Sequence, residues 1–503
     1  MSGSVIDAAA WWSQTVPDQT AIDFDGDVVS YAQLGEWVDG VAAWLQDNGV
    51  TAGDRVGLVG ANSLEWCVAA LATWKAGAIV CGFNQRFVAG DLRPLIELCV
   101  PTVVLADVTH LDRVKDIVSR STPFAVLSLK EVADARTRAH SPMPRPVVSA
   151  EDPTLIVFTS GTTGTPKGVV YTHGTIAGVV YEWSLAERVE PNGLRPLLAL
   201  PLFSAAGVVW GLARSMVHGG TLYLQQQFDP PRALEILQKA RITTLNGPPI
   251  IFEQIAAVPG FDEVMLDHVT TAWVGGSRVT SSLLERWRAQ GVALRQMYGQ
   301  TETGGGATVM PAGGALEKCG SGGMFTRIRV VDESGDDCPP DVTGEIIVRG
   351  PGVFPGYWCN PEATARALRA GWLYTGDLGS LDEDGVLTFI DRVGEIINSG
   401  GLKISPIEVE ALIQQIPGVA EVAVFAVADP KFGETPAAIV SGEAEVDPTE
   451  VVAFCNERLA DFKVPRYVIL HTGPLPRMAS GKINKRDLRA TYCDAPQRFP
   501  RVR

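Results

Sequence analysis

Short apolar runs alternate with amphipathic segments from residue 55 to residue 275, and this alternation limits the fold more than any other feature of the sequence. Residues 55–60 and 78–81 have the composition of buried strands, and residues 66–75 between them have the spacing of a helix. The strand pattern returns at 102–106, 124–128, 196–201, 221–224, 243–245 and 271–274. Because strands separated by helices pair in parallel and carry the helices on their faces, the sequence predicts an α/β fold of stacked layers.

The composition of the chain changes after about Cys319. Glycine, proline and aspartate become dense there, and residues 344–350 alternate in the manner of an antiparallel strand. Beyond Asp391, a strand over 419–427 and a helix over 448–460 indicate a further small α/β unit.

A chain of 503 residues has room for about three units of roughly 150 residues each. We therefore predict a large N-terminal domain over 1–391, which includes a β-rich subdomain at about 319–391. A small, mobile α+β C-terminal domain is predicted over 392–503.

The chain carries an excess of acidic residues. Its 42 lysines and arginines against 57 aspartates and glutamates give a net charge of −15, which repels nucleic acid and anionic membranes. The eight cysteines form no C-x-x-C pair, and the N-terminus lacks a signal peptide. No stretch reaches the roughly 20 apolar residues that span a bilayer. We therefore expect a cytoplasmic protein with no nucleic-acid partner and no transmembrane segment.

The segment 159–168, TSGTTGTPKG, follows the apolar strand over 155–158 and is the strongest chemical signal in the chain. Serine and threonine hydroxyls, glycine amides and one lysine together make a cradle for phosphate oxygens. The segment lacks the G-x-x-x-x-G-K-[ST] spacing of a P-loop. A Gly/Thr-rich surface turn is the simpler alternative, but the preceding buried strand argues against it. The candidate phosphate-binding residues are Thr159, Ser160, Gly161, Thr162, Thr163, Gly164 and Lys167.

This segment resembles the phosphate loop of the adenylate-forming superfamily, which contains acyl-CoA synthetases, peptide-synthetase adenylation domains and luciferases. The resemblance extends over nearly the whole chain in the family's order, through VGGS at 274–277, YGQTE at 298–302, YTGD at 374–377, DR at 391–392, SGGLKISPIE at 399–408 and PRMASGK at 476–482. An ordered set of this kind is far more specific than any one motif. It implies the superfamily's fold, and it implies ATP, Mg²⁺ and coenzyme A as cofactors and co-substrates.

The resemblance implies a role for each residue around the nucleotide. Tyr298 offers a flat ring to adenine, Asp377 accepts from the ribose hydroxyls, and Arg392 supports the ribose or the phosphates. Taken alone, Tyr298 would be a half-buried strand-end residue and Asp377 an Asx cap. The other nucleotide-side residues of the matched motifs are Gly275, Gly276, Ser277, Gly299 and Gln300.

Thr301, Glu302 and Lys482 are the implied catalytic residues. Thr301 donates to a phosphate oxygen, and Glu302, with Thr163, is an oxygen ligand of the kind that Mg²⁺ takes together with substrate phosphates. Lys482 bridges the substrate carboxylate and the α-phosphate, where a positioned cation stabilises developing charge. Taken alone, Glu302 would be a helix cap and Lys482 a solvated side chain. Because the substrate carboxylate is itself the nucleophile, no catalytic triad is needed, and His173 is interpreted as structural.

The resemblance implies that the loop at Gly400, Gly401 and Lys403 lies on the thiol side of the site.

The sequence departs from the family at two positions. Ser204 stands where many acyl-CoA synthetases carry a gating histidine, and it does not titrate near neutrality. Gly394 stands at the hinge position, where the family often has Asp or Lys, and glycine accepts either sign of φ. The hypothesis is that the C-terminal domain rotates about Gly394 between adenylation and thiol transfer.

The implied acyl pocket is apolar and contains small residues. Its members are Phe203, Ser204, Ala205, Val209, Trp210, Gly304 and Gly305. The pocket segments contain no Arg or Lys, whereas a second substrate carboxylate would require a cation. A monocarboxylic acid is therefore favoured, and fatty, alicyclic and aryl acids all remain open.

The sequence as a whole predicts an acyl-CoA synthetase acting on a small-molecule carboxylic acid, ATP and coenzyme A. The first alternative is a stand-alone acyl-AMP ligase that loads a carrier protein. The chain has no attached carrier domain and no extra insertion between 350–351 and 376–377, and both points favour coenzyme A. The second alternative, a nucleotide-binding regulator without catalysis, conflicts with the joint presence of Lys167, Glu302, Asp377, Arg392 and Lys482. A homodimer is left open.

Overall fold

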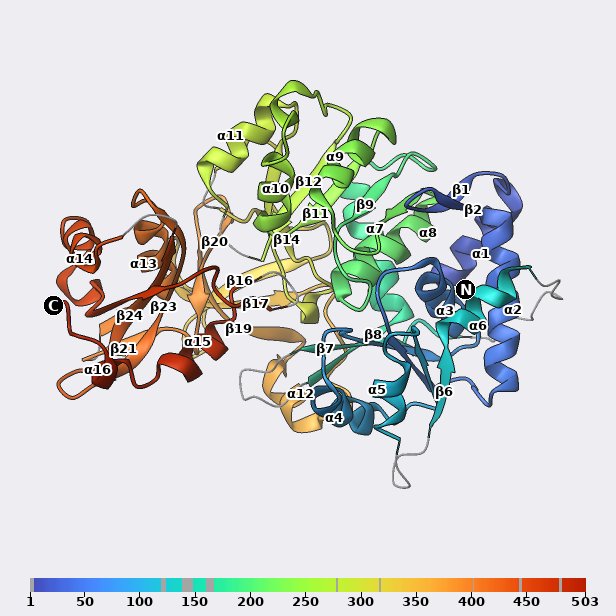
Figure 1. Ribbon diagram of the computed structural model, residues 1–503, viewed down its shortest axis with the longest axis horizontal. Coiled ribbons are helices and arrows are strands. Elements are labelled where there is room, and N and C mark those ends of the chain that lie inside the picture. The colour runs from blue at the N-terminus through green and yellow to red at the C-terminus, as the bar shows by residue number, and fades with distance from the viewer. Residues whose placement is uncertain are drawn as a thin grey trace. The chain divides into compact units, whose positions relative to one another are not determined.

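The structure is a computed structural model that describes residues 4–118, 124–137, 148–159, 167–276, 279–315, 318–400, 402–442, 446–478 and 482–503 (Figure 1). The chain forms two compact units. The first contains Met1–Ile328 and Val348–Tyr374, and the second contains Arg329–Ile347 and Thr375–Arg503. The predicted domain boundary at residues 391 and 392, and the mobility of the smaller domain, stay predictions.

A six-stranded sheet in the first unit has the order β6-β5-β3-β4-β7-β8. Its strands are β3 (Arg55–Val59), β4 (Ile79–Phe83), β5 (Val103–Ala106), β6 (Ala125–Ser128), β7 (Pro153–Thr159) and β8 (Lys167–Thr172). All neighbouring pairs are parallel except β7 and β8, which form an antiparallel hairpin. The short helices α4 (Ala89–Cys99), α5 (Leu111–Lys115) and α6 (Leu129–Asp134) connect these strands.

Helix α3 (Leu64–Lys75) shows how the local sequence sets one of these crossovers. Ser63 caps its start by accepting a hydrogen bond from the amide of Trp66 at 3.2 Å. The helix is predominantly apolar and every residue except Glu65 is buried, as expected for a helix packed between layers. It ends before Gly77, whose φ of 72° suits the reversal into β4.

A nine-stranded sheet in the same unit has the order β15-β14-β13-β12-β11-β9-β10-β1-β2. In this order its strands are Ser321–Gly322, Thr308–Val309, Leu294–Tyr298, Thr271–Gly275, Thr244–Gly247, Pro196–Leu198, Leu222–Leu224, Thr20–Phe24 and Asp27–Ser30. The central strands are parallel and the outer pairs are antiparallel. Helices α9 (Pro230–Lys239), α10 (Pro249–Ala256) and α11 (Ser281–Ala289) pack on one face in a continuous apolar cluster (Figure 1).

The two sheets share one large core. Helices α1 (Val5–Thr15), α2 (Tyr31–Asp47), α3 and α7 (His173–Ala186) contribute to it, as does a π-helix over Ala206–Ala213 that continues into α8 (Arg214–His218). The predicted stacked α/β layers are confirmed. No helix among the described residues is long and apolar enough to cross a membrane.

The antiparallel region comprises β16 (Arg327–Val331), β17 (Gly344–Arg349), β18 (Leu368–Arg369), β19 (Trp372–Leu381) and β20 (Leu387–Arg392). In the second unit, a further sheet contains β21 (Ile397–Ser399), β22 (Leu402–Ile404), β23 (Val419–Asp429), β24 (Gly433–Gly442) and β25 (Tyr467–His471). Helices α13 (Pro406–Ile413) and α14 (Pro448–Asn456) cover one face of this sheet, and α15 (Lys485–Tyr492) and α16 (Ala495–Arg498) cover the other (Figure 1). Val422 and Val424 face the first pair while Ala423 and Phe425 face the second, which is the period of two that a sheet buried on both faces requires.

Candidate functional site

The predicted phosphate loop connects two residues that pair directly. Thr159 ends β7, Lys167 begins β8, and the two are register partners, with the Thr159 hydroxyl donating to the Lys167 carbonyl at 3.5 Å. The intervening residues Ser160, Gly161, Thr162, Thr163 and Gly164 lie outside the described residues. The structure therefore fixes both ends of the loop, at the edge of the six-stranded sheet.

Lys167 and Glu302 both contact Tyr357. The Lys167 ammonium lies 4.9 Å from the centroid of the Tyr357 ring, and the Tyr357 hydroxyl donates to Glu302 Oε1 at 2.8 Å. Burial, together with the charge of Glu302, raises the pKa of Tyr357, so the phenol stays a neutral donor. The structure thus brings together two predicted site residues from distant segments, through a third that the sequence analysis missed.

The turn that carries Glu302 is a single 3₁₀ turn over Thr301–Thr303. The Tyr171 hydroxyl donates to the Thr301 carbonyl, and the Phe354 amide donates to the Glu302 carbonyl at 2.9 Å. Burial raises the pKa of Tyr171 well above its usual value, with Glu302 contributing. Tyr171 and Phe354 therefore hold the backbone on which the predicted catalytic Thr301 and Glu302 are placed.

The nucleotide-side strands end in close backbone contacts. Tyr298 ends β13 and is 6% exposed, so little of its ring is free to receive a base in this structure. A Cβ on Gly299 would lie 2.7 Å from Gly306 Cα, and one on Gly275 would lie 2.6 Å from Met297 Cγ. Only glycine fits at these two positions. Gly276 has a φ of 86° and Gln300 precedes the 3₁₀ turn, while Ser277 lies outside the described residues.

Ser204 has a structural role in the turn that opens the π-helix. Its hydroxyl donates to the Pro201 carbonyl at 2.7 Å and accepts from the Gly207 amide at 3.0 Å. A Cβ on Gly207 would lie 2.1 Å from Pro201 O, so the backbone closes tightly here. The Ser204 side chain is therefore engaged in capping this turn.

Trp210 occupies much of the space beside the three consecutive glycines. Its indole nitrogen donates to the Gly304 carbonyl at 2.9 Å, and a Cβ on Gly305 would lie 2.9 Å from the same nitrogen. The ring is 5% exposed and packs edge-on against Trp273 with centroids 5.2 Å apart. Gly304 and Gly305 thus make room for an indole. Phe203 is half-buried, and Ala205 and Val209 are buried around it.

Arg214 lies one helical turn after Trp210, and no motif in the sequence marks it. Its guanidinium carbon lies 5.2 Å from the Trp273 ring centroid and 5.9 Å from that of Trp210. The side chain is fully buried, and none of its guanidinium nitrogens has a hydrogen-bond partner among the described residues. Burial lowers its pKa to about 10, with the nearby Glu187 opposing this. Because the side chain has no exposed surface, it lines no open pocket.

The remaining site residues belong to the second unit. Asp377 on β19 and Arg392 on β20 are register partners, and Arg392 Nε lies 3.2 Å from Asp377 Oδ1. Lys482 stands at the base of a loop whose residues 479–481 lie outside the described residues, and its carbonyl accepts from the Met478 amide at 2.7 Å. Burial lowers the pKa of Lys482, Arg392 acts in the same direction, and Asp377 and Glu395 oppose both. These interactions place Asp377, Arg392 and Lys482 in one electrostatic cluster.

The segment that precedes the proposed hinge is anchored in a buried ionic network. Asp391 accepts from the Ser405 hydroxyl at 2.7 Å and from the Arg392 amide at 2.8 Å. Lys485 lies 2.6 Å from Glu410 Oε1, and although burial works in the opposite direction, the charge of Glu410 raises the pKa of Lys485. This network was missed because its members are spread over separate motifs and no local pattern marks them.

The predicted hinge and thiol-loop residues are only partly described. A Cβ on Gly394 would meet nothing within 4 Å, and its φ is outside the left-handed region. This conformation therefore does not itself require glycine at 394. Gly400 has a φ of 61°, and its amide donates to the Phe432 carbonyl. Lys403 pairs with Asn398 in the β21–β22 ladder, and Gly401 lies outside the described residues.

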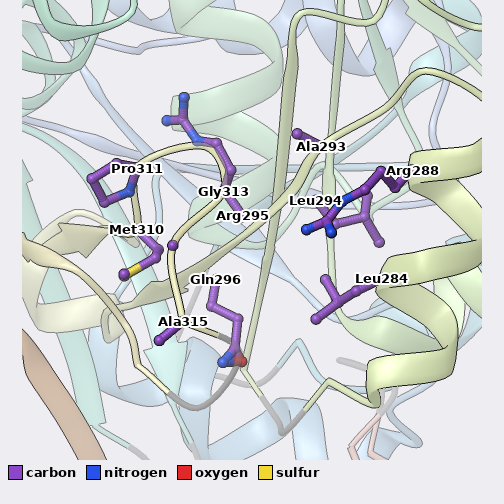
Figure 2. A pocket seen from close by; sticks show the side chains of 11 residues that line it. Leu284, Arg288, Ala293, Leu294, Arg295, Gln296, Met310, Pro311, Gly313 and Ala315 are labelled. Carbon is purple, nitrogen blue, oxygen red and sulfur yellow. The ribbon is translucent and has the colours of Figure 1, made fainter.

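Two hollows are lined by residues of the first unit. Figure 2 shows a cavity of about 20 Å³ lined by residues of α11, β13 and the loop after β14, including Arg295 and Gln296. It has room for about one water molecule, and no predicted site residue lines it. A wider groove of about 520 Å³ is lined by Tyr357 and its neighbours 355–361.

The sequence matches known families over most of its length. Residues 9–358 match the family described as AMP-binding enzyme, and residues 408–482 match the AMP-binding enzyme C-terminal domain. A feruloyl-CoA synthase of Amycolatopsis sp is 35% identical over 485 residues, covering 95% of this chain and 96% of that protein. A long-chain-fatty-acid–CoA ligase of Mycobacterium tuberculosis is 32% identical over 471 residues, covering 92% and 93%.

The fold matches solved structures equally broadly. The ATP-bound crystal structure of MatB from Rhodopseudomonas palustris superposes with a TM-score of 0.89 at 29% identity, covering 98% of this chain and 100% of that one. An o-succinylbenzoate coenzyme A synthetase from Bacillus subtilis, in complex with ATP and a magnesium ion, gives a TM-score of 0.86 at 26% identity, covering 96% and 99%.

Proposed function

The chain belongs to the family of AMP-binding enzymes and is an ATP-dependent acid–CoA ligase, and we propose that it activates a monocarboxylic acid as its acyl-adenylate and then passes the acyl group to coenzyme A. In the first step a carboxylate oxygen attacks the α-phosphorus of ATP and pyrophosphate leaves. In the second step the thiol sulfur attacks the acyl carbonyl carbon and AMP leaves.

The observation that supports the proposal most directly is the meeting of Lys167 and Glu302 at Tyr357, beside the two ends of the phosphate loop. A cation suits the phosphates, and a carboxylate suits a metal that accompanies them. Among the described residues, the recorded contacts of Lys167 and Glu302 are with Tyr357, and neither side chain forms an ion pair. Both groups remain free to act on a nucleotide.

Magnesium fits the proposed site. Glu302 Oε1 accepts from Tyr357, and Oε2 has no hydrogen-bond partner in the part of the chain that the structure describes. Mg²⁺ takes one or two carboxylates together with substrate phosphates, so Glu302, with Thr163, would hold it. Bound there, the ion would neutralise phosphate charge during the displacement.

The second unit supplies the groups for the ribose and the reacting carboxylate. Asp377 would accept the ribose hydroxyls, and Arg392, about half exposed, would support the sugar or the phosphates. Lys482 would stabilise charge at the α-phosphate in its protonated form. The electrostatic influence of Asp377 on Lys482 supports a shared role for them. Glycine at 394 would allow the segment that follows it to turn for the thiol step, in which Gly400, Gly401 and Lys403 would line the thiol entrance.

The acid is proposed to carry a single carboxylate. The implied pocket segments contain no lysine or arginine, and Arg214, one helical turn beyond Trp210, is fully buried against the rings of Trp210 and Trp273. A second carboxylate would therefore lack an exposed cation to pair with.

A cytoplasmic location also belongs to the proposal and is supported by the scattered cysteines. Assembly as a homodimer is kept as an open part of it, to be settled by light scattering.

The proposal is tested by measuring pyrophosphate and AMP release with a panel of fatty, alicyclic and aryl acids, with and without coenzyme A. We expect stoichiometric pyrophosphate release without thiol and repeated turnover with coenzyme A. Turnover only with a phosphopantetheinylated carrier protein would establish the alternative, a stand-alone acyl-AMP ligase. Absence of pyrophosphate release with every acid would refute adenylation.

A further inference from the structure

Tyr357 lies on a short segment that is bonded to both sides of the proposed phosphate and metal site. The Trp358 amide donates to the Gly168 carbonyl at 2.7 Å, and Tyr357 forms a β-bridge with Val169. On the other side, the Phe354 amide donates to the Glu302 carbonyl at 2.9 Å. The segment 354–358 therefore links the strand that begins at Lys167 to the turn that carries Glu302.

The Tyr357 side chain is itself held in place. Its ring packs edge-on against Phe354 with centroids 4.8 Å apart, and Phe354 is 1% exposed. Its backbone amide donates to Thr364 Oγ1 at 2.9 Å. The ring and hydroxyl thus have a defined direction before any ligand binds, which is what a group that orients others requires.

The two charged side chains use different parts of this tyrosine. Lys167 lies over the ring face, where the negative quadrupole attracts an ammonium group. Glu302 accepts a hydrogen bond from the hydroxyl at one carboxylate oxygen. Among the described residues Lys167 and Glu302 form no ion pair with each other. Tyr357 therefore holds opposite charges near one another without letting them neutralise each other.

We propose that Tyr357 is a positioning residue that keeps the Glu302 carboxylate directed at the magnesium ion and the Lys167 ammonium directed at the phosphates of MgATP. The inference rests on the proposed function for the identity of the ligand. In this arrangement Glu302 is the metal ligand, and the hydrogen bond from Tyr357 orients its carboxylate. Removal of such a hydrogen bond typically weakens metal affinity by about 10-fold to 100-fold.

The substitutions Tyr357→Phe and Tyr357→Leu separate the two contacts. Phenylalanine keeps the ring under Lys167 and removes the hydrogen bond to Glu302, whereas leucine removes both. Tyr223 provides a matched control, because its hydroxyl accepts from Arg195 at 2.9 Å and its ring carries the same guanidinium at 5.8 Å, away from the site. Tyr223→Phe therefore makes the same chemical change at a tyrosine that also has a hydroxyl hydrogen bond and a cation at its ring.

The measurement is calorimetric binding of ATP with magnesium and with EDTA, without acid or thiol, alongside thermal unfolding. We expect Tyr357→Phe to weaken binding about tenfold with magnesium and to leave binding in EDTA unchanged. Tyr357→Leu should weaken both, and Tyr223→Phe neither. In a Glu302→Gln background, Tyr357→Phe should have no further effect on the magnesium dependence.

Two outcomes would overturn the inference. One is binding of MgATP by Tyr357→Phe at the wild-type affinity. The other is an equal loss with magnesium and with EDTA accompanied by a fall in the unfolding temperature, which would make Tyr357 a purely structural residue. Failure of the proposed function is a separate result, since a wild-type protein that binds MgATP but releases no pyrophosphate with any acid would leave this test intact.

Discussion

Replacement of Asp377 gives the sharpest test of the nucleotide half of the site. The residue is 2% exposed, and its backbone is fixed by neighbours: the Gly376 amide donates to Glu345 at 2.9 Å, and the Thr375 hydroxyl donates to the Ile346 carbonyl at 2.6 Å. Because this turn is anchored independently of the Asp377 carboxylate, substitution there should remove ligand contacts without moving the strand.

The expected loss follows from the bonds that Asp377 would make. Two ribose hydroxyls donating to a carboxylate contribute about 1.5–3 kcal/mol each, so Asp377→Ala should cost about 3 kcal/mol or more of ATP binding, which is over 100-fold. Asparagine keeps one neutral acceptor, so Asp377→Asn should cost about 2 kcal/mol, or roughly 30-fold. The ion pair with Arg392, whose side chain is 48% exposed, should add no more than about 1 kcal/mol of folding stability.

The assay is pyrophosphate release at varied ATP, repeated across the alkaline pH range. Asp377 raises the pKa of Lys482 against the effects of burial and of Arg392. Removing its charge lowers that pKa further, and the protonated lysine is the active form. The alkaline fall in rate should therefore begin at lower pH in Asp377→Asn than in the wild type. Asp447→Asn, at the N-cap of α14, removes an equal charge elsewhere in the second unit and should change neither quantity.

An Asp377→Ala protein that is correctly folded and whose KM for ATP stays within twofold of the wild type would refute the role of Asp377 as a ribose ligand. If the substitution raised the KM for ATP but left the alkaline fall in rate unchanged, only half of the prediction would fail. Asp377 would remain the proposed ribose ligand, and its electrostatic influence on Lys482 would be excluded.

Three further predictions concern other parts of the site. Lys482→Ala should slow acyl-adenylate formation by about 10²–10³, as expected for the loss of one positioned charge-stabilising group; an unchanged single-turnover rate of pyrophosphate release would rule out its role. Trp210→Ala should lower the free energy of unfolding by about 3–5 kcal/mol and extend activity to longer or bulkier acids, measured by urea unfolding and by an acid series; an unaltered acid preference would mean that Trp210 does not bound the acyl pocket. Gly394→Pro should slow transfer to coenzyme A and spare adenylation, as measured by quenched-flow of each half-reaction, and wild-type rates in both would exclude the hinge.

The positions of the elements could be predicted from the sequence because the signal is local. The strand predicted at 55–60 is β3 at Arg55–Val59, and the one predicted at 419–427 is β23 at Val419–Asp429. An apolar run bounded by turn residues determines a buried strand without reference to distant parts of the chain. The same locality made the hydroxyl-rich and glycine-rich segments recognisable as candidate ligand-binding loops.

The sequence could not predict which side chains meet. Tyr357 and Glu302 are 55 residues apart, and their hydrogen bond arises only because one segment bridges β8 and the turn after β13. Arg214 follows Trp210 by one helical turn, and no sequence motif marks it, yet it is a fully buried cation beside two indoles. The glycines at 304 and 305 gave no indication from the sequence of what lies beside them, and the structure places the Trp210 indole there.

By itself the sequence determined the α/β layers, the order of the motifs and the chemical types of the groups that would act on ATP, because hydrophobic period and residue chemistry are properties of short segments. Only the tertiary structure decided that Lys167 and Glu302 share one tyrosine and that Asp377, Arg392 and Lys482 form one electrostatic cluster. Distances between side chains from separate segments depend on how whole sheets and helices pack. That packing is a collective property of the fold, and no local pattern in the chain records it.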